Sequence, residues 1–385
     1  MTADANRRVL PASLPTSIQT PEVLVDLDIL HRNIDALGRV VSARGQRLRP
    51  HAKTHKSPQI AAMQLAAGAC GLTVATVGEA EVFANAGVDD LFIAYPLWVS
   101  EPMAPRLAAL ARRVTLRIGV DSVEGARNIV ARLGPDAAAL AVMIELDSGH
   151  HRSGTVPEHA LEIARTARQG GLHVAGIFTF PGHSYEPGAS AGAVQDESRV
   201  LDEAARSLRA AGFTDLELSG GSTPTAHTTA AGAATEVRPG VYVFNDAQQL
   251  EMGHCAVADI ALTVASTVVS RRPHPDGGGR VVLDAGSKVL GSDRPAWASG
   301  FARIRGCPEA RVTALSEHHG TVEFPAGGHL PGLGDILQVI PNHVCLVPNL
   351  VDAVTVVQRE DSGAEAEGTY RIVDRWTVAA RGQNS

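Results

Sequence analysis

Short runs of apolar and β-branched residues alternate with amphipathic segments between residues 46 and 244. Runs of this kind predict strands. Eight of them occur, at residues 46–53, 72–76, 91–95, 114–120, 140–146, 173–178, 215–219 and 237–244. Strands that alternate with helices favour parallel βαβ units, and eight units predict a closed (β/α)8 TIM-like barrel. A doubly wound open sheet is the alternative.

The segment before the first of these strands has a helical pattern. Asp28 can cap its first turn, and Gly45 can end it. Four apolar residues share one face at helical spacing: Leu30, Ile34, Leu37 and Val41. Residues 122–134 and 157–171 have similar spacing, which supports the alternation of helices with strands.

The pattern changes after about residue 255, where strand-like segments follow one another with little helical periodicity. They lie at residues 261–272, 279–286, 320–327, 335–347, 353–361 and 369–381, separated by Gly, Pro and Asp turns. We therefore expect a barrel domain over residues 20–252 and an all-β domain over residues 253–385, together with residues 1–19. The strand-like residues 22–28 are not needed by the barrel and are a candidate to pair with the β domain.

Composition and charge narrow the class of partner. A chain of 385 residues with 44% hydrophobic side chains can bury the cores of two domains. Its formal net charge of −7 contains no acidic or basic block, so the sequence gives no electrostatic sign of a nucleic acid or membrane partner. No run reaches the roughly 18 apolar residues of a membrane helix. Four scattered cysteines and no signal peptide indicate a reducing, cytoplasmic setting.

Residues 47–60, RLRPHAKTHKSPQI, bring four cationic or ionisable side chains close together: His51, Lys53, His55 and Lys56. Lys53 would lie where the first barrel strand ends, and (β/α)8 barrels carry their chemistry at that end. An exposed basic turn is the alternative, because most lysines are solvated. Position alone does not decide between the two.

A second candidate feature, LSGGSTPTA at residues 218–226, follows the seventh barrel strand. Gly220 and Gly221 allow close approach to a ligand, hydroxyls come from Ser222 and Thr223, and a following helix start would supply N–H groups. Barrels often hold phosphate in this region, although a plain turn is the alternative. A reactive lysine and a phosphate site at one barrel end suggest pyridoxal 5'-phosphate held as a Schiff base.

A candidate metal pair stands in IPNHVCLVPN, residues 340–349. His343 and Cys345 are two residues apart, so on a regular strand both side chains would point to one face. Two ligands are too few for a structural zinc site but suit an open site completed by water and substrate. A buried cysteine beside a surface histidine is the alternative.

The chain resembles the D-serine dehydratase and D-threonine aldolase family, whose members are fold-type III pyridoxal-phosphate enzymes with a barrel similar to that of alanine racemase. The resemblance extends from about residue 20 to WTVAARG at residues 376–382, near the end of the chain. The motifs that carry it, in order, are RPHAKTHK, ELDSGHHRSG, FPGHSY, SGGSTPT, EVRPGVYVFND, DAGSKVLGSDR, LSEHHG and PNHVC.

The resemblance implies roles for individual residues. Lys53 would carry the Schiff base, and Arg152 would approach the pyridine nitrogen of the cofactor. Tyr185 is similar to a ring-edge or substrate contact, and Tyr242 to a phosphate contact beside Ser222 and Thr223. For both tyrosines, core packing is the alternative. His51, His55 and His183 flank this site and are candidates for supporting contacts.

In the family, His343 and Cys345 correspond to the metal site of the dehydratase-like members, whereas aldolase members tend to have aspartate in place of the cysteine. Thiolate with imidazole favours Zn²⁺, whereas imidazole with carboxylate accommodates Mn²⁺ or Mg²⁺. The sequence therefore predicts zinc. His318 and its neighbour His319 are candidates to assist the leaving hydroxyl.

The implied activity is that of a pyridoxal-phosphate- and zinc-dependent lyase acting on D-β-hydroxy amino acids. Removal of the Cα proton by Lys53, with the metal on the β-hydroxyl, would give a 2-oxo acid and ammonia. Retro-aldol cleavage to glycine and an aldehyde is the alternative. A racemase would need an acid/base from the β domain, where Tyr370 is the one tyrosine, and a non-catalytic cofactor carrier would need only the barrel. D-serine, D-threonine and D-3-hydroxyaspartate remain open as substrates, and a homodimer is implied.

Overall fold

The computed structural model of the chain describes residues 13–227, 232–275, 277–327, 329–360 and 369–385. Two compact units are present, and each is described by itself. The barrel unit comprises residues 34–242 and 382–385. The β unit comprises the described residues up to 33 and residues 243–381. The division differs from the expected boundary at 252/253.

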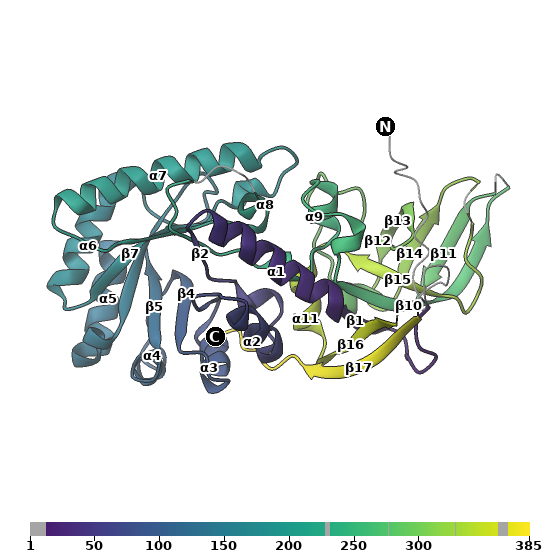
Figure 1. The fold of residues 1–385 in the computed structure, drawn as a ribbon, viewed down its shortest axis with the longest axis horizontal. Coiled ribbons are helices and arrows are strands. Elements are labelled where there is room, and N and C mark those ends of the chain that lie inside the picture. The colour runs from purple at the N-terminus through teal and green to yellow at the C-terminus, as the bar shows by residue number, and fades with distance from the viewer. Residues whose placement is uncertain (1–12, 228–231, 276, 328, 361–368) are drawn as a thin grey trace. The chain divides into compact units, whose positions relative to one another are not determined.

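Eight parallel strands form the barrel unit, with helices outside them (Figure 1), which confirms the predicted (β/α)8 fold. Each strand pairs with the next along the chain, from β3 to β9, and β2 pairs with β9. A single parallel bridge between His51 and Thr73 joins the first strand to the second and closes the ring. The strands are β2 Arg47–Leu48, β3 Leu72–Val74, β4 Asp90–Pro96, β5 Thr115–Val120, β6 Ala141–Leu146, β7 His173–Thr179, β8 Glu217–Gly220 and β9 Glu236–Val237.

Helices connect these strands and begin where the sequence offers caps. The Thr76 hydroxyl accepts a hydrogen bond from the Glu79 N–H at 3.0 Å at the start of one helix, and Ser122 does the same for Gly125 at 3.1 Å. The helices are α1 Leu27–Ala43, α2 Pro58–Ala66, α3 Val77–Asn85, α4 Met103–Ala111, α5 Val123–Leu133, α6 Ala160–Gln169, α7 Ser190–Ala210 and α8 Thr223–Ala226. None of the helices in the described residues is long and apolar enough to cross a membrane.

In helix α1, the predicted apolar face is confirmed, but the predicted N-terminal cap at Asp28 is wrong. Its four predicted core residues are at most 3% exposed: Leu30, Ile34, Leu37 and Val41. The cap is Asp26, whose Oδ1 accepts a hydrogen bond from the Ile29 N–H at 3.0 Å. Asp28 instead lies inside the helix, where its carboxylate accepts a hydrogen bond from Gln358. The helix starts at Leu27, two residues before the start that a cap at Asp28 would give, because β1 runs directly into it.

Charged side chains occupy much of the barrel interior. The guanidinium of Arg238 lies 5.5 Å from the ring centre of Phe92 and 5.2 Å from that of Phe178. Arg49, which has no exposed surface, pairs with Glu236 at 2.8 Å and with Asp90 at 2.5 Å. Burial of these charges is tolerated because each has an opposite charge or hydrogen-bond partner beside it.

Within its described residues, the β unit has nine strands in the order β11-β14-β13-β12-β15-β10-β1-β16-β17, which confirms the predicted all-β domain. Strand β10 pairs with both β15 and β11, so six of these strands close into an antiparallel barrel. The strands are β1 Glu22–Asp26, β10 Leu262–Pro273, β11 Gly279–Leu283, β12 Ala302–Ile304, β13 Cys307–Leu315, β14 Gly320–Phe324, β15 Ile336–Pro341, β16 Ala353–Glu360 and β17 Thr369–Thr377, with the short helices α9 Ala247–Glu251, α10 Ser287–Leu290 and α11 Val347–Leu350.

Two features explain why the units divide before residue 252. Strand β1 pairs with β10 and β16, as the sequence suggested, so the chain enters the barrel unit only within α1. After β9, Asp246 caps α9 through the Gln249 N–H and also accepts from the Val344 N–H, both within the β unit. Strands β12 and β13 were not predicted, because arginines and a proline interrupt their apolar pattern.

Candidate active site

The first barrel strand leads directly into the stretch that carries Lys53. After β2 the chain stays extended to His51 and then forms the 3-10 helix Ala52–Thr54. The His51 Nδ1 atom caps this helix by accepting a hydrogen bond from the Lys53 N–H at 3.4 Å. Lys53 therefore follows the carboxyl end of a barrel strand, which is the end where barrel enzymes carry their catalytic groups.

His51 is held in its neutral form. Burial lowers the pKa of its imidazole well below the usual range, and the neighbouring cations Lys53 and Arg238 lower it further. Because Nδ1 accepts the hydrogen bond from the Lys53 N–H, the single ring proton is assigned to Nε2. His51 can thus donate from Nε2 to a neighbouring acceptor at neutral pH.

The second lysine of the stretch, Lys56, has a structural partner. Its Nζ lies 3.2 Å from Oε1 of Glu79, and the two side chains are only 8% and 1% exposed. Glu79 Oε2 also accepts a hydrogen bond from the Ala75 N–H at 2.7 Å. This buried ion pair holds Lys56 in place, so Lys53 is the lysine that remains a candidate for covalent chemistry.

Tyr242 belongs to a chain of buried polar groups in the barrel unit. Its hydroxyl accepts a hydrogen bond from Gln64 Nε2 at 2.9 Å, and Gln64 Oε1 lies 3.2 Å from Nε2 of His55. The His55 Nδ1 accepts from the Ser57 N–H, so its Nε2 donates to Gln64. Burial raises the pKa of Tyr242 and lowers that of His55 to about 4, which keeps both rings neutral. Tyr242 therefore keeps a phenolic proton to donate.

Hydroxyl groups gather around the predicted phosphate loop. Ser222 Oγ lies 2.8 Å from Ser184 Oγ and 3.1 Å from Thr225 Oγ1. The Thr223 hydroxyl accepts from the Tyr242 N–H at 3.2 Å, which links the loop to Tyr242. Gly221 needs to be glycine here, because its φ is +78° and a Cβ would lie 2.9 Å from the side chain of Val237.

One part of the phosphate prediction is wrong. The helix that follows the loop, α8, has only four residues, so it provides no extended helix N-terminus. The N–H of Ser222 donates to Thr225 Oγ1 and the N–H of Thr225 donates to Ser222 Oγ, in a closed capping box. Pro224 has no N–H. The loop therefore presents hydroxyls and the glycine backbone rather than a row of helical N–H groups.

Arg152 and Tyr185 both approach the ring of Phe180 at the carboxyl ends of β6 and β7. The Arg152 guanidinium carbon lies 5.0 Å from the centre of the Phe180 ring, and the Tyr185 ring centre lies 6.2 Å from it. Arg152 is exposed. Nearby, Glu145 is buried, and its Oε2 lacks a hydrogen-bond partner among the described residues. Two residues that the resemblance assigns to the cofactor site thus share one aromatic neighbour.

His183 lies beside this group, in the turn after β7. A Cβ added to Gly149 would lie 3.3 Å from its ring, and its Nε2 is 3.5 Å from a carboxylate oxygen of Asp196. Both ring nitrogens are buried, and neither makes a hydrogen bond to another described residue, because the approach to Asp196 is too long and poorly aligned.

The predicted metal pair lies in the β unit. The expectation that His343 and Cys345 lie on a regular strand is wrong, because β15 ends at Pro341 and residues 344–346 form a 3-10 turn. Their side chains nevertheless meet in a hydrogen bond. Burial lowers the pKa of His343, but the neighbouring Cys345 and Asp293 more than offset this, so that the pKa lies well above its usual range. The turn, rather than strand alternation, brings imidazole and thiol together.

Asp293 orients the imidazole of this pair. Its Oδ2 lies 2.5 Å from His343 Nδ1, and the same chain segment accepts a hydrogen bond at the Asp293 carbonyl from Asn342. A carboxylate at Nδ1 leaves Nε2 of His343 for a metal. No group of three or more His, Cys, Asp or Glu side chains suited to a metal occurs in the described residues.

The remaining predicted residues of the β unit lie elsewhere. His318 and His319 are exposed in the turn between β13 and β14. Tyr370, the racemase candidate, donates a hydrogen bond from its hydroxyl to Asp26 Oδ2 at 2.7 Å. Burial, together with Asp26, raises the pKa of Tyr370 to about 12, which makes it a poor base.

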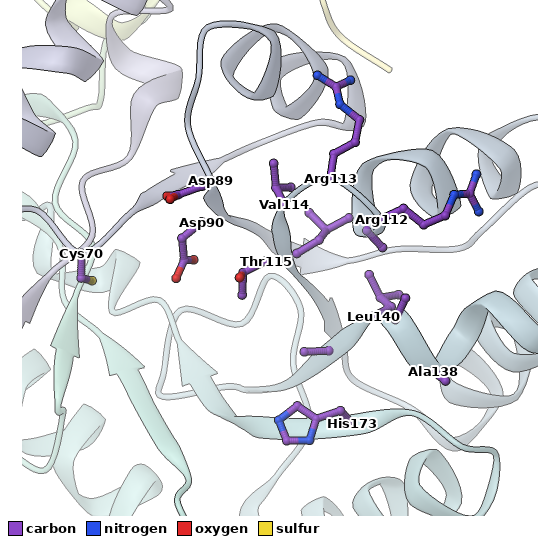
Figure 2. A pocket seen from close by; sticks show the side chains of 14 residues that line it. Cys70, Asp89, Asp90, Arg112, Arg113, Val114, Thr115, Ala138, Leu140 and His173 are labelled. Atoms are coloured by element: carbon purple, nitrogen blue, oxygen red, sulfur yellow. The ribbon is translucent and has the colours of Figure 1, made fainter.

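A cavity of about 790 Å³ lies at the other end of the barrel, where the strands begin. Figure 2 shows Asp90, Thr115 and His173 around it, from the first residues of β4, β5 and β7. The side chains of Arg112 and Arg113 point away from its centre (Figure 2). None of the predicted site residues lines this cavity, and the amino ends of barrel strands are the end that usually serves stability.

Three residues of the site region received no role from the sequence, although Asp293 stands in the family motif DAGSKVLGSDR. Asp293 lies 50 residues before His343, so spacing could not connect them. Gln64 supports Tyr242 from 178 residues away. Glu197, whose carboxylate accepts from the Gly221 N–H, lies on α7 and has no distinguishing motif. Only the folded chain brings these groups to the predicted residues.

Two family models cover most of the chain. The alanine racemase N-terminal domain matches residues 25–248, and a putative serine dehydratase domain matches residues 261–357. The first match fits the barrel and the second the β unit, which is the domain combination of fold-type III pyridoxal-phosphate lyases. The chain belongs to the D-serine dehydratase and D-threonine aldolase family, whose members are lyases that act on D-β-hydroxy amino acids.

Relatives within the family carry out different reactions. D-threo-3-hydroxyaspartate dehydratase of Delftia sp. (strain HT23) is 37% identical over 353 residues, which cover 86% of this chain and 91% of that protein. Its solved structure matches with a TM-score of 0.82 and 34% identity, over 94% of this chain and 97% of that one. D-threonine aldolase of Arthrobacter sp. is 31% identical over 373 residues, 95% of this chain and 93% of that protein.

Proposed function

We propose that the chain is a pyridoxal-phosphate- and zinc-dependent dehydratase that converts D-serine-like β-hydroxy amino acids to 2-oxo acids and ammonia. The observation that carries the choice of dehydration is the contact between His343 and Cys345, with Asp293 on Nδ1 of the imidazole. A thiolate and an imidazole form a donor set that suits zinc, and zinc is a Lewis acid able to assist a leaving hydroxyl.

The barrel unit fits pyridoxal 5'-phosphate. Lys53 would hold its aldehyde, Tyr242 has a phenolic proton for a phosphate oxygen, and Ser222 and Thr223 add hydroxyls beside the glycine backbone. Arg152, which pairs with no carboxylate within 4 Å among the described residues, would approach the pyridine nitrogen, with His51 beside Lys53. When bound, the cofactor supplies an electron sink for the charge left at Cα of the substrate.

Lys53 would move the proton of the reaction. The free amine of Lys53, when present beside the bound cofactor, would remove the Cα proton on the face that it occupies. The neutral His51 at the start of the same turn fixes the Lys53 backbone through its Nδ1 atom. Lys56 cannot substitute, because its amine is paired with Glu79.

The β unit fits a catalytic metal better than a structural one. His343 and Cys345 provide two ligands, which leaves positions for water and a substrate oxygen. A cysteine-to-alanine mutant of the relative D-threo-3-hydroxyaspartate dehydratase is described as being in the metal-free form. That description implies a metal in the relative, and it supports the proposal that this chain binds one at His343 and Cys345.

Racemisation fits less well. A racemase needs a second acid/base group, and the phenol of Tyr370 is hydrogen-bonded to Asp26 within the core of the β unit. Retro-aldol cleavage uses the same parts as dehydration, and the 31% identity to D-threonine aldolase makes it the principal alternative.

The test is a product analysis. Purified protein is reconstituted with pyridoxal 5'-phosphate and zinc and incubated with D-serine, D-threonine and D-threo-3-hydroxyaspartate. We expect 2-oxo acid and ammonia in equal amounts, lost in Lys53→Ala and in Cys345→Ala, with His318→Ala reporting whether that exposed histidine takes part. Glycine with an aldehyde as the main products would reject dehydration and place the chain with the aldolases.

Two further parts of the proposal concern the setting of the protein. We propose a homodimer, which the family resemblance supports, and light scattering of the purified protein tests it by mass. A cytoplasmic location is also proposed, on the scattered cysteines, which form no disulfide among the described residues.

A further inference from the structure

A buried carboxylate lies directly behind the predicted phosphate loop. Glu197, on α7, is 5% exposed, and its Oε2 accepts a hydrogen bond from the Gly221 N–H at 2.7 Å. A Cβ added to Gly220 would lie 2.6 Å from the carboxylate carbon and from Oε2. A side chain at position 220 would therefore displace the Glu197 carboxylate.

Few other groups compensate the charge of Glu197. Arg238 is the one cation that acts on it, but its guanidinium is committed to the Ser219 hydroxyl and the Thr179 carbonyl. The positions of α7 one turn away carry apolar side chains: Ala193, Val194, Val200 and Leu201. Burial raises the pKa of Glu197 to about 7, although the Gly221 N–H and Arg238 oppose the shift.

Other titratable groups on the elements packed against α7 are engaged elsewhere or exposed. His183, in the turn after β7, faces Asp196. On α6, Arg168 lies 4.0 Å from the centre of the Phe213 ring. Glu158 and His159 before α6 and His227 after α8 are exposed. Among the described residues, Gly221 and Arg238 are thus the main groups that set the protonation state of Glu197. A ligand bound in the phosphate loop would also affect it.

We propose that Glu197 is a positioning residue of the phosphate loop, and that its carboxylate takes up a proton when a phosphate dianion binds in front of Gly221. The inference rests on the proposed use of pyridoxal 5'-phosphate. Glu197 fixes the Gly220–Gly221 backbone through the Gly221 N–H, while its negative charge faces the same loop. Two anions on opposite sides of one glycine pair repel each other across a low-dielectric region. Protonation of Glu197 removes this repulsion and still leaves a carbonyl oxygen for the Gly221 N–H.

The test measures cofactor affinity against pH. Apoprotein is titrated with pyridoxal 5'-phosphate between pH 6 and pH 9, using wild type, Glu197→Gln and the control Glu203→Gln, a partly exposed glutamate on the same helix. Between pH 6 and pH 9, the Kd for pyridoxal 5'-phosphate should rise in both proteins, and the rise should be at least about tenfold larger for wild type than for Glu197→Gln. Only wild type gains a buried negative charge as the pH rises. The control should follow wild type.

A phosphate-free probe separates this effect from the chemistry of Lys53. With pyridoxal in place of pyridoxal 5'-phosphate, wild type and Glu197→Gln should show the same pH dependence, because the lysine reaction is common to both. A difference between the variants that persists with pyridoxal would overturn the phosphate-linked role. Equal pH profiles with pyridoxal 5'-phosphate would overturn it as well.

Calorimetry of wild type keeps the proposal testable if Glu197→Gln does not fold. Titrations at pH 7.5 in buffers of different ionisation enthalpy should show more proton uptake with pyridoxal 5'-phosphate than with pyridoxal. Equal proton uptake would refute the proposal while leaving the cofactor assignment intact. Failure of wild type to bind pyridoxal 5'-phosphate at any pH would instead refute the proposed function, and this inference with it.

Discussion

Lys53 and Lys56 stand three residues apart in one basic stretch, and their surroundings distinguish them. The Lys56 amine is paired with a buried carboxylate, whereas the backbone of Lys53 is held by a neutral imidazole at the carboxyl end of a barrel strand. A similar distinction separates Asp293, which contacts a candidate metal ligand, from Asp284, which accepts hydrogen bonds from Thr20 and Ser266 in the β unit. At this scale, the partner of a side chain decides its role.

The two lysines should respond differently to substitution. Lys53→Ala should abolish covalent attachment of pyridoxal 5'-phosphate, detected by borohydride reduction and mass spectrometry, with little change in stability. Lys56→Ala should leave Glu79 buried without its cation and lower the free energy of unfolding by about 3 kcal/mol. Urea denaturation of both variants measures this. Attachment of the cofactor to Lys56 in the wild-type protein would contradict the assignment.

Asp293→Asn should weaken zinc binding by about 10- to 100-fold, because the amide no longer holds Nδ1 of His343 as a carboxylate does. The dissociation constant of zinc, measured by competition with a chromogenic chelator, reports this without any need for turnover. Asp352→Asn, at an exposed carboxylate paired with Arg381, is the matched control and should leave zinc affinity unchanged. Equal affinities in the two variants would show that Asp293 does not support the metal ligand.

At the scale of elements, the junction between β1 and α1 shows how one residue serves two neighbours. Asp26 ends the strand, caps the helix through Oδ1 and accepts the Tyr370 hydroxyl through Oδ2. The phosphate loop is similar, because Glu197 on α7 fixes the glycine pair at the end of β8. Elements far apart in sequence are thus joined by single buried carboxylates.

Asp26→Ala should destabilise the protein by about 2 kcal/mol, because it removes a helix cap and leaves the half-buried phenol of Tyr370 without its hydrogen-bond partner. Asp28→Ala, at the residue that the sequence favoured as the cap, should change stability by less than about 0.5 kcal/mol. Denaturant unfolding of the two variants compares them directly. A larger effect for Asp28 would restore the sequence-based assignment.

Glu197 should also make the apoprotein sensitive to pH. Its pKa in the folded protein is about 7, above the value of 4.5 expected in the unfolded chain, so the folded state binds the proton more tightly. The contribution of this proton binding to the free energy of unfolding is fully present below pH 4.5 and is lost as the pH rises through about 7. The free energy of unfolding of Glu197→Gln, relative to that of wild type, should therefore increase by about 3 kcal/mol between pH 4.5 and pH 8. Urea midpoints measured at several pH values, with Glu203→Gln as the control, test this.

At the scale of the whole molecule, the chain contains two units, each with its own buried core and its own part of the proposed chemistry. The barrel unit provides the candidate groups for the cofactor, and the β unit provides the candidate metal pair. The cores do not depend on a metal, since the pair offers two ligands rather than the four of a structural zinc site.

Removal of zinc should therefore stop 2-oxo acid formation but leave the fold intact. After chelation, we expect the free energy of unfolding to change by less than about 1 kcal/mol, in contrast to zinc-dependent folds. Cofactor absorbance should also persist, because Lys53 and the phosphate loop lie in the barrel unit. Unfolding of the protein on chelation, followed by circular dichroism, would show that the metal has a structural role instead.

Much of the fold could be read from local patterns. Seven of the eight barrel strands, the apolar face of α1 and the all-β character of the second unit appear in the sequence as runs and spacings, because residues that are buried on one face recur periodically. The eighth predicted strand, residues 237–244, shares only Val237 with β9, and its residues 241–243 form a 3-10 helix instead. Strands β12 and β13 were missed because Arg303, Arg305 and Arg311 break the apolar alternation. The cap of α1 and the strand geometry of the metal pair were misjudged by a few residues, within which local signals do not discriminate.

The sequence by itself determined the order of elements, the stretch that carries Lys53 and the presence of a histidine and a cysteine near each other, because these depend on residues close together in the chain. Only the tertiary structure decided which lysine is paired, which carboxylate orients His343 and which glutamate lies behind the glycine pair. Those contacts join residues separated by 23 to 50 positions. Hydrogen bonds and ion pairs act over about 3 Å, so they are set by the packing of whole elements and leave no periodic signal in the sequence.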